Sequence, residues 1–271
     1  MRRFSAQLPW LLLCLGLMTV PAIAQQAPCG GDFGTWLQAV KQEAATQGIS
    51  QRTIQSALGG ITYDPTIIAR DHAQGVFRQS FQEFSGRMVP PRLARGRRLL
   101  AQYRPLFDRI ERQYGVPGPI LVAIWGLETD FGADDGHFPT IRALATLAYN
   151  CRRADKFRAE LLDALKIVNR GDMAASQMRG AWAGEIGQTQ FLPSSYLKFA
   201  VDYDGRGRRD LIHSVPDVLA STANYLKSYG WQRGQPWGEG TANFQVLQQW
   251  NASEVYTKTV AYFAEQLAHG Q

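Results

Sequence analysis

The chain has 271 residues, of which 45% are hydrophobic and 19% charged, and its formal net charge is +6 at pH 7. This length and composition predict a globular protein with a core of normal size and exclude a mainly disordered chain. The positive charge is mild and does not form the dense basic stripe of a nucleic-acid-binding protein, so we expect no nucleic-acid partner.

The first 24 residues have the pattern of an export signal. Arg2 and Arg3 provide the positive start, residues 8–20 the short apolar segment, and residues 22–24 (Ala-Ile-Ala) the cleavage site. The apolar segment is too short to favour a membrane span, and Cys14 follows a leucine instead of the small residue that a lipidation signal requires. A twin-arginine signal is the weaker alternative. We therefore expect an exported, soluble mature protein without a lipid anchor or a transmembrane segment.

Two cysteines remain after this cleavage, Cys29 and Cys151. In an oxidising compartment an even pair suggests a disulfide, which would tether the new N-terminus to the middle of the chain. Two buried thiols are the alternative. We favour the bridge because Cys29 lies so close to a terminus that something must hold it in place.

The mature sequence predicts α-helices joined by irregular connections, since the alternation typical of strands is scarce. Ser50 is placed to cap the second helix, and Pro90-Pro91 breaks the chain before a basic helix. Residues 231–241 predict a loop, and we find no repeat and no long linker that would mark a second independent domain. The predicted helices span residues 32–47, 50–58, 65–84, 92–114, a stretch that starts at 117, and then 141–149, 156–169, 216–229 and 255–267.

Glu128 lies at the end of the apolar stretch that starts at residue 117, in the run WGLETDFG. Helical spacing places Ile120, Ile124 and Leu127 on a core-facing stripe, with Glu128 on or beside the same face. Burial there raises the pKa of a carboxylate toward that of a working general acid. Most helical glutamates are solvated, so it is the surrounding motifs that favour a functional interpretation.

Arg152 and Arg153 form the first of these motifs, two cations at a predicted helix start. Because they oppose the helix dipole there, an anion should compensate them unless they are simply solvated.

The run GAWAGEIGQTQFLPSSY at residues 180–196 is the second motif. Its glycines allow close backbone approach, and polar amides such as Gln190 stand beside aromatic rings such as Tyr196, a combination that suits a carbohydrate groove. The lack of Gly-Lys-Ser/Thr excludes a phosphate-binding P-loop. The alternative is a glycine-rich loop that packs on the core. We expect Glu185, a rival carboxylate within this loop, to be exposed to solvent.

The third motif has aspartates near the spacing of an EF-hand calcium loop. The candidate ligands are Asp202, Asp204, Asp210 and Asp217. Arg206 stands at position 5 and His213 at position 12, where oxygen ligands are required. The loop's arginines can instead satisfy the aspartates directly, which would give the same turn without a metal ion. We favour that metal-free alternative.

Trp250-Asn251-Ala252-Ser253 precedes a helix that contains Tyr256. Asn251 or Ser253 caps this helix in one interpretation. In the other, Asn251 and Tyr256 lie in a ligand groove.

Together these motifs resemble the membrane-bound lytic transglycosylase B family of exported murein transglycosylases. The resemblance spans nearly the whole mature chain and is strongest from 114 to 229. WGLETDFG, the arginine pair, GEIGQTQFLPSSY, the EF-hand-like loop and the run STANY at 221–225 occur in the family in the same order. Five ordered motifs are far more specific than one glutamate in an octamer.

The resemblance implies a mainly α fold with a lysozyme-like core, of the goose-type lysozyme and soluble lytic transglycosylase kind, and additional helices packed around a glycan groove. Residues 1–24 are then the signal peptide and 25–271 the catalytic domain. Within that domain we expect an N-terminal helical part at about 30–110, the core at about 111–230, and a C-terminal helix that returns to the groove.

The resemblance makes Glu128 the lone catalytic acid/base. The positions that match groove-lining residues of the family are Arg152, Arg153, Gln190, Tyr225, Asn251 and Tyr256. To these we add two aromatic residues, Tyr196 and Trp250. Trp250 departs from the family, where tyrosine is common, but keeps a stacking ring, and Ala181 stands where a serine hydroxyl often lies near the catalytic glutamate.

The expected activity is peptidoglycan cleavage at the β-1,4 bond between N-acetylmuramic acid and N-acetylglucosamine, with a 1,6-anhydro product and no required cofactor. Calcium stays open as the alternative. A lysozyme-type muramidase that uses water is one rival function, with Asp134 or, less favoured, Asp130 as second carboxylate. A non-catalytic peptidoglycan-binding or assembly protein is another, and a calcium-dependent module a third. We expect a periplasmic location and, as partners, glycan strands and proteins of a cell-wall synthesis or secretion complex.

Overall fold

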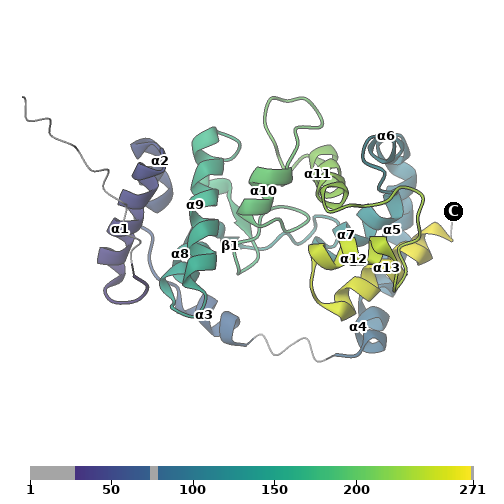
Figure 1. The fold of residues 1–271 in the computed structure, drawn as a ribbon, viewed down its shortest axis with the longest axis horizontal. Helices are drawn as coiled ribbons and strands as arrows, with labels where there is room; N and C mark the ends of the chain where they lie inside the picture. Colours follow the sequence, from purple (N-terminus) through teal and green to yellow (C-terminus); the bar gives the residue numbers. More distant parts are fainter. Residues whose placement is uncertain (1–27, 74–78, 270–271) are drawn as a thin grey trace, which may run out of the picture.

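The computed structural model describes residues 28–73 and 79–269, so the predicted export signal lies outside the described residues. The described part is mainly helical, with one antiparallel sheet of two short strands (Figure 1). The helices are α1 (Phe33–Thr46), α2 (Gln51–Leu58), α3 (Pro65–His72), α4 (Phe81–Met88), α5 (Pro90–Gln102), α6 (Arg104–Tyr114), α7 (Gly118–Thr129), α8 (Thr140–Tyr149), α9 (Ala154–Arg170), α10 (Pro193–Phe199), α11 (Val215–Ser228), α12 (Ala242–Trp250) and α13 (Glu254–Ala268), with a 3₁₀ turn at Ala175–Gln177. The strands are β1 (Phe138–Pro139) and β2 (Arg179–Gly180).

Two groups of helices meet through α10. On one side α1, α2 and α3 pack with α8 and α9, and on the other α4, α5 and α6 pack with α7, α11, α12 and α13. Helix α10 contacts α9 in the first group and α11 in the second, and Figure 1 places it between them. The functional motifs of the sequence therefore lie on elements from both groups.

Helix α7 is buried on nearly every side, because α5, α6, α11 and α13 all contact it. The predicted apolar stripe was too narrow, since every residue from Ile120 to Leu127 is buried. Gly126 makes this packing possible: a side chain there would meet the ring of Phe131 at 2.7 Å. The helix ends at Thr129 and its C-cap Asp130 has a left-handed φ of 51°, so the chain turns away two residues after Glu128.

Several predicted helix boundaries needed correction. Residues 65–84 were predicted as one helix but form parts of two, and Ser80 begins the second with a capping box to Glu83. The predicted helix 92–114 is also two, because Pro105 lacks the N–H that would continue the ladder past Tyr103. Helices α10 and α12 were not predicted. The Ser50 cap and the loop at 231–241 are confirmed.

The predicted disulfide is confirmed. Cys29 and Cys151 are bonded, with 5.2 Å between their Cα atoms and a separation of 122 residues. Closing a loop of this length lowers the entropy of the unfolded chain, which stabilises the folded state by about 4–5 kcal/mol in the chain-entropy model. The bridge ties the segment before α1 to the connection between α8 and α9, as does a hydrogen bond of 3.0 Å from Gly30 N to Tyr149 O.

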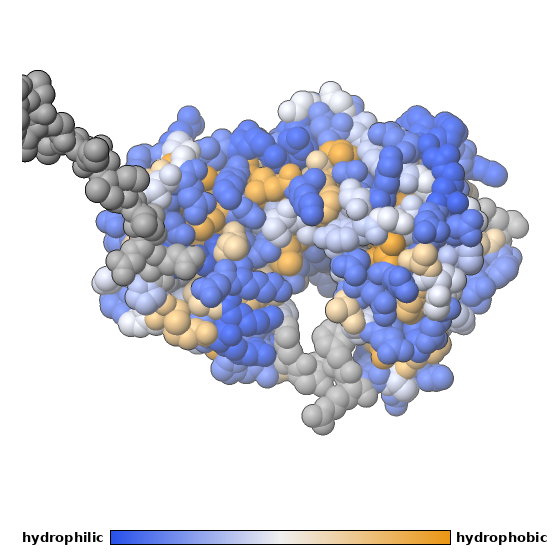
Figure 2. All heavy atoms as spheres, in the orientation of Figure 1, coloured by the Kyte–Doolittle hydropathy of each residue, from blue (hydrophilic) through white to orange (hydrophobic). Residues whose placement is uncertain are grey.

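The surface facing the viewer in Figure 2 is mostly hydrophilic, and hydrophobic residues reach it in scattered places. Within residues 28–73 and 79–269, no helix combines the length and the apolar character needed to cross a membrane.

Candidate active site

Glu128 lies where the end of α7 meets the junction of α12 and α13. Its Oε1 atom accepts a hydrogen bond of 2.6 Å from the Tyr256 hydroxyl and one of 3.0 Å from Nε1 of Trp250. Trp250 is the last residue of α12. Tyr256 lies in the first turn of α13, where Ser253 caps the helix. Two helices near the C-terminus thus hold a carboxylate from the middle of the chain.

Burial raises the pKa of Glu128 from its ordinary value to about 7. The hydrogen bonds from Tyr256 and Trp250 act in the opposite direction because they favour the ionised form, and the nearby Glu185 carboxylate adds a small upward effect. Near neutral pH the group is therefore present in both acid and base forms. Since Oε1 already accepts two hydrogen bonds, the proton of the acid form belongs on Oε2.

A cavity of about 430 Å³ opens beside this carboxylate. It is lined by Glu128, Ala181, Glu185, Gln190, Phe191, Leu192, Ser195, Tyr225, Gln249, Trp250 and Asn251. The mixture of ring faces, amides, a hydroxyl and two carboxylates suits a sugar, which carries both apolar faces and hydroxyl groups.

Three of the predicted groove residues build the walls of this cavity. Tyr225 donates its hydroxyl proton to the Gln249 carbonyl at 2.6 Å, and its ring packs against the ring of Trp250 with 4.9 Å between centroids. The side-chain amide of Gln190 bonds to three backbone groups, donating to Asp135 O and Gly187 O and accepting from Ala181 N. Gln190 thus fixes the glycine-rich loop, at a left-handed φ of 54°.

Asn251 also lines the cavity, but its Oδ1 accepts a hydrogen bond of 2.9 Å from Ser253 N. Both predicted roles, groove lining and helix capping, therefore occur in this segment. Asn251 lines the cavity and orders the turn into α13, and Ser253 caps the helix. Tyr256 reaches the site through its bond to Glu128 and is largely buried.

The prediction that Tyr196 binds substrate needs correction. Its side chain is fully buried, and its hydroxyl donates to Arg209 O at 2.6 Å. The ring of Tyr196 packs into the core and does not line the cavity. Helical burial of this kind could not be anticipated, since α10 itself was not predicted.

The anion predicted to compensate the arginine pair is Asp71, at the end of α3. This nearly buried carboxylate accepts a hydrogen bond of 2.7 Å from Arg152 and is also paired with Arg153. Neither arginine lines the cavity beside Glu128. Their predicted role in substrate binding stays a prediction.

Glu185 was predicted to be exposed, and this was wrong. It lines the cavity, its Oε2 atom is buried, and burial raises its pKa. The loop folds tightly because Gly180 lets the Glu185 carbonyl approach, since a Cβ there would meet that oxygen at 1.7 Å, and because Ile186 bridges to Phe191. These contacts are set by loop closure, which hydrophobic periodicity does not report.

Three of the four candidate calcium ligands come together. Asp202, Asp204 and Asp217 each offer an oxygen within 4.8 Å of the others. Asp210 does not join them: its carboxylate accepts hydrogen bonds from the backbone after it and lies 3.2 Å from the His213 ring and 3.6 Å from Arg208.

The residues present do not fit an EF-hand calcium site. Arg206 occupies position 5, and its Nε lies 3.0 Å from Asp204 Oδ2. The oxygens of Asp202 accept backbone N–H groups of the loop at 2.9 and 2.7 Å, and the buried Asp217 accepts three more. Calcium affinity depends on the number of anionic ligands, and here a guanidinium neutralises one of them.

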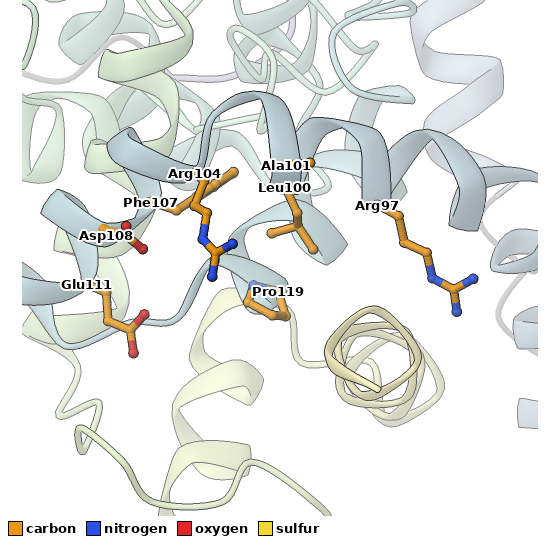
Figure 3. Close-up of a pocket in the computed structure, with 9 residues that line it drawn as sticks. Arg97, Leu100, Ala101, Arg104, Phe107, Asp108, Glu111 and Pro119 are labelled. Carbon is orange, nitrogen blue, oxygen red and sulfur yellow. The ribbon is translucent and has the colours of Figure 1, made fainter. Parts of the chain in front are cut away.

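Other cavities lie away from Glu128. One of about 370 Å³ is shown in Figure 3, where the Arg104 side chain points into a space between Asp108 and Glu111 of α6 and Pro119 of α7. Another, of about 860 Å³, lies against α4 and α13. Neither contains a predicted site residue, so the chemistry of its side chains, and not its size, distinguishes the cavity beside Glu128.

The family model described as "Transglycosylase SLT domain" matches residues 32–242. Membrane-bound lytic murein transglycosylase B of Escherichia coli (strain K12) is 40% identical over 134 residues, which are 49% of this chain and 37% of that relative. The match thus spans well under two thirds of the curated relative's length.

Among solved structures, SltB3 from Pseudomonas aeruginosa in complex with NAG-NAM-pentapeptide aligns with a TM-score of 0.84 and 33% identity, covering 88% of this chain and 80% of that one. The E. coli lytic transglycosylase Slt35 in complex with calcium aligns with a TM-score of 0.79 and 25% identity, covering 90% and 96%. The predicted mainly α, lytic transglycosylase-like fold is confirmed by these alignments.

Proposed function

Because the chain belongs to the transglycosylase SLT domain family, we propose that it is a lytic murein transglycosylase. Its substrate is the glycan strand of peptidoglycan, and it cleaves the β-1,4 bond from N-acetylmuramic acid to N-acetylglucosamine. The observation that carries this proposal is Glu128, a half-buried carboxylate whose pKa is raised to about 7 at the edge of a cavity that suits a sugar. SltB3, the relative with NAG-NAM-pentapeptide bound, supports the substrate class.

In the first step Glu128 donates its proton from Oε2 to the glycosidic oxygen as the bond to C1 breaks. Tyr256 and Trp250 hold Oε1 and stabilise the carboxylate that forms. The positive charge that develops at C1 is stabilised by the N-acetyl group of the substrate itself, a known exception to the scheme with two carboxylates.

In the second step the ionised Glu128 removes the proton from the C6 hydroxyl of the same sugar. The C6 oxygen closes onto C1, and the product carries a 1,6-anhydro ring. Glu128 ends the cycle protonated. One acid/base residue suffices because the nucleophile is part of the substrate.

A lysozyme-type muramidase is the second candidate, and Glu185 is the observation that favours it, since it adds a second carboxylate to the cavity. The two earlier candidates for this role fit less well. Asp130 is 3.5 Å from Arg92 and 3.6 Å from Arg95, and neither it nor Asp134 lines the cavity.

Mass spectrometry of purified peptidoglycan digested with the wild-type protein and with Glu128→Gln separates these functions. A transglycosylase releases muropeptides that are lighter by one water than the hydrolytic products, and Glu128→Gln releases none. Full-mass reducing products would instead establish the muramidase. Wild-type protein that binds sacculi but releases nothing would leave only the non-catalytic binding function.

The same proposal includes a periplasmic location without a lipid anchor. The disulfide supports an oxidising compartment, and the N-terminal sequence pattern supports export. It includes no required metal ion, because the Arg206 guanidinium already neutralises Asp204 in the aspartate loop. Partners from a cell-wall synthesis or secretion complex stay a prediction.

A further inference from the structure

Glu185 carries a buried acceptor atom that nothing in the described part of the chain satisfies. Its Oε2 atom has no hydrogen-bond partner, whereas Glu128 in the same cavity has two donors on Oε1. A buried polar atom without a partner costs free energy, and in native structures it calls for an explanation such as a ligand. The proton-transfer steps proposed above do not use this carboxylate.

The position of Glu185 indicates where its missing partner comes from. The residue lines the cavity beside Glu128, together with Gln190 and the ring of Trp250. The backbone that carries Glu185 is closely packed, because its carbonyl lies against Gly180 and the next residue, Ile186, bridges to Phe191. A molecule bound next to Glu128 therefore lies against the side chain of Glu185.

The charged groups around Glu185 define the donor that it needs. Burial raises the pKa of Glu185, while the backbone N–H groups of Glu185 and Ala183, and then the positive charges of Lys156 and Arg153, favour its ionised form. An ionised carboxylate accepts hydrogen bonds but donates none. Hydroxyl and amide groups of an N-acetylated sugar are donors of this kind, and a bond from them to a charged oxygen is stronger than one between neutral groups.

We propose that Glu185 is a substrate-binding residue, whose Oε2 accepts a hydrogen bond from a hydroxyl or amide N–H of the sugar bound beside Glu128. This inference rests on the proposed function, since it takes an N-acetylated glycan as the ligand. It assigns Glu185 to binding of the sugar, and leaves proton transfer to Glu128.

Binding of tetra-N-acetylchitotetraose by isothermal titration calorimetry tests the proposal without any need for turnover. The reference protein is Glu128→Gln, which removes both cleavage and the titration of Glu128. Adding Glu185→Ala to it should weaken binding about tenfold or more, the usual effect of losing a hydrogen bond to a charged group. Adding Glu111→Ala, an exposed carboxylate of α6 in the cavity of Figure 3, is the matched control and should change nothing.

A second arm uses pH, which a merely structural role of Glu185 would not affect. In the Glu128→Gln protein, affinity should fall as the pH drops through the raised pKa of Glu185, and adding Glu185→Gln should remove that dependence. Melting temperatures of all variants identify any that are unfolded, and Glu185→Gln, which keeps the size of the side chain, then replaces Glu185→Ala.

The outcomes separate this inference from the proposed function. Equal affinity with and without the Glu185 substitution, or an affinity that does not change with pH, overturns the role of Glu185 and leaves the transglycosylase intact. A reference protein that binds no chitotetraose at all, joined to a wild-type protein that releases no muropeptide, overturns both.

Discussion

The hydroxyl of Tyr256 donates a hydrogen bond of 2.6 Å to Glu128 Oε1 across 128 positions of sequence. Tyr256 is buried and Glu128 is half-buried, and the bond favours the ionised form of the carboxylate. This contact links the C-terminal helix α13 to the end of α7, and it explains why the site needs the last helices of the chain.

Replacing Tyr256 with Phe should raise the pKa of Glu128 above about 7, because the hydroxyl stabilises the ionised form. The alkaline limb of the pH–activity profile, which reports loss of the acid form, should therefore move to higher pH. The profile of muropeptide release from pH 5 to 9 measures this. Tyr262→Phe, on an exposed residue of the same helix, is the control. A limb that moves to lower pH would contradict the stabilisation of the ionised carboxylate by the Tyr256 hydroxyl.

Glu128→Gln should reduce muropeptide release by about 10³-fold or more, since a general acid contributes about 10²–10⁴-fold and this residue serves in both steps. The released products are quantified by chromatography. Retained binding of sacculi shows that the variant is folded. Activity within tenfold of wild type would require another acid in the cavity.

The same substitution should change the pH dependence of stability. Glu128 binds its proton more tightly in the folded protein, about pKa 7, than in the unfolded chain, about 4.5, so its contribution to stability is lost as the pH rises between these values. The free energy of unfolding of the wild type should therefore fall relative to Glu128→Gln by about 2–4 kcal/mol from pH 4 to pH 8. Urea titrations at both pH values measure it. A constant difference between the two proteins would mean that the pKa is not raised.

Calcium should leave the melting temperature of the wild type unchanged, because the Arg206 guanidinium already neutralises Asp204. Arg206→Asp supplies the missing carboxylate at position 5 and should create a calcium-dependent rise in melting temperature. The expected gain in the free energy of unfolding is about 2.7 kcal/mol at a calcium concentration 100 times the Kd. Thermal unfolding with calcium and with EDTA distinguishes the two proteins. A rise in the wild type would show that the loop binds calcium despite its arginine.

Removing the disulfide with Cys29→Ser and Cys151→Ser together should lower the free energy of unfolding by about 2–5 kcal/mol. Denaturant unfolding checks the size of the loss. Reduced wild-type protein should match the double variant, and muropeptide release should persist while the protein stays folded, since the bridge lies away from the cavity of Glu128. Unchanged stability would mean that other contacts already tether the N-terminal segment.

The sequence alone was sufficient for the helical class, the disulfide partners and the special position of Glu128. Each of these depends on local or pairwise features: the period of apolar residues, the presence of two remaining cysteines, and a carboxylate within an apolar run followed by ordered motifs. Loop closure and helix packing depend on residues that are far apart in the sequence, so local patterns did not predict them. Glu185, which lies between glycines in sequence, is half-buried in the cavity beside Glu128, while Tyr196 lies in the core.

Tertiary structure decided what each group near Glu128 does. Only the packing of α13 against α7, and of α12 against α13, brings Trp250 and Tyr256 to one oxygen of Glu128. Only the folded loop shows that Asp210 stays apart from the other three aspartates. Burial and hydrogen bonding set the pKa of a carboxylate, and both arise from residues that are distant in sequence. The sequence therefore identified the acid, and the fold determined its proton affinity and its neighbours.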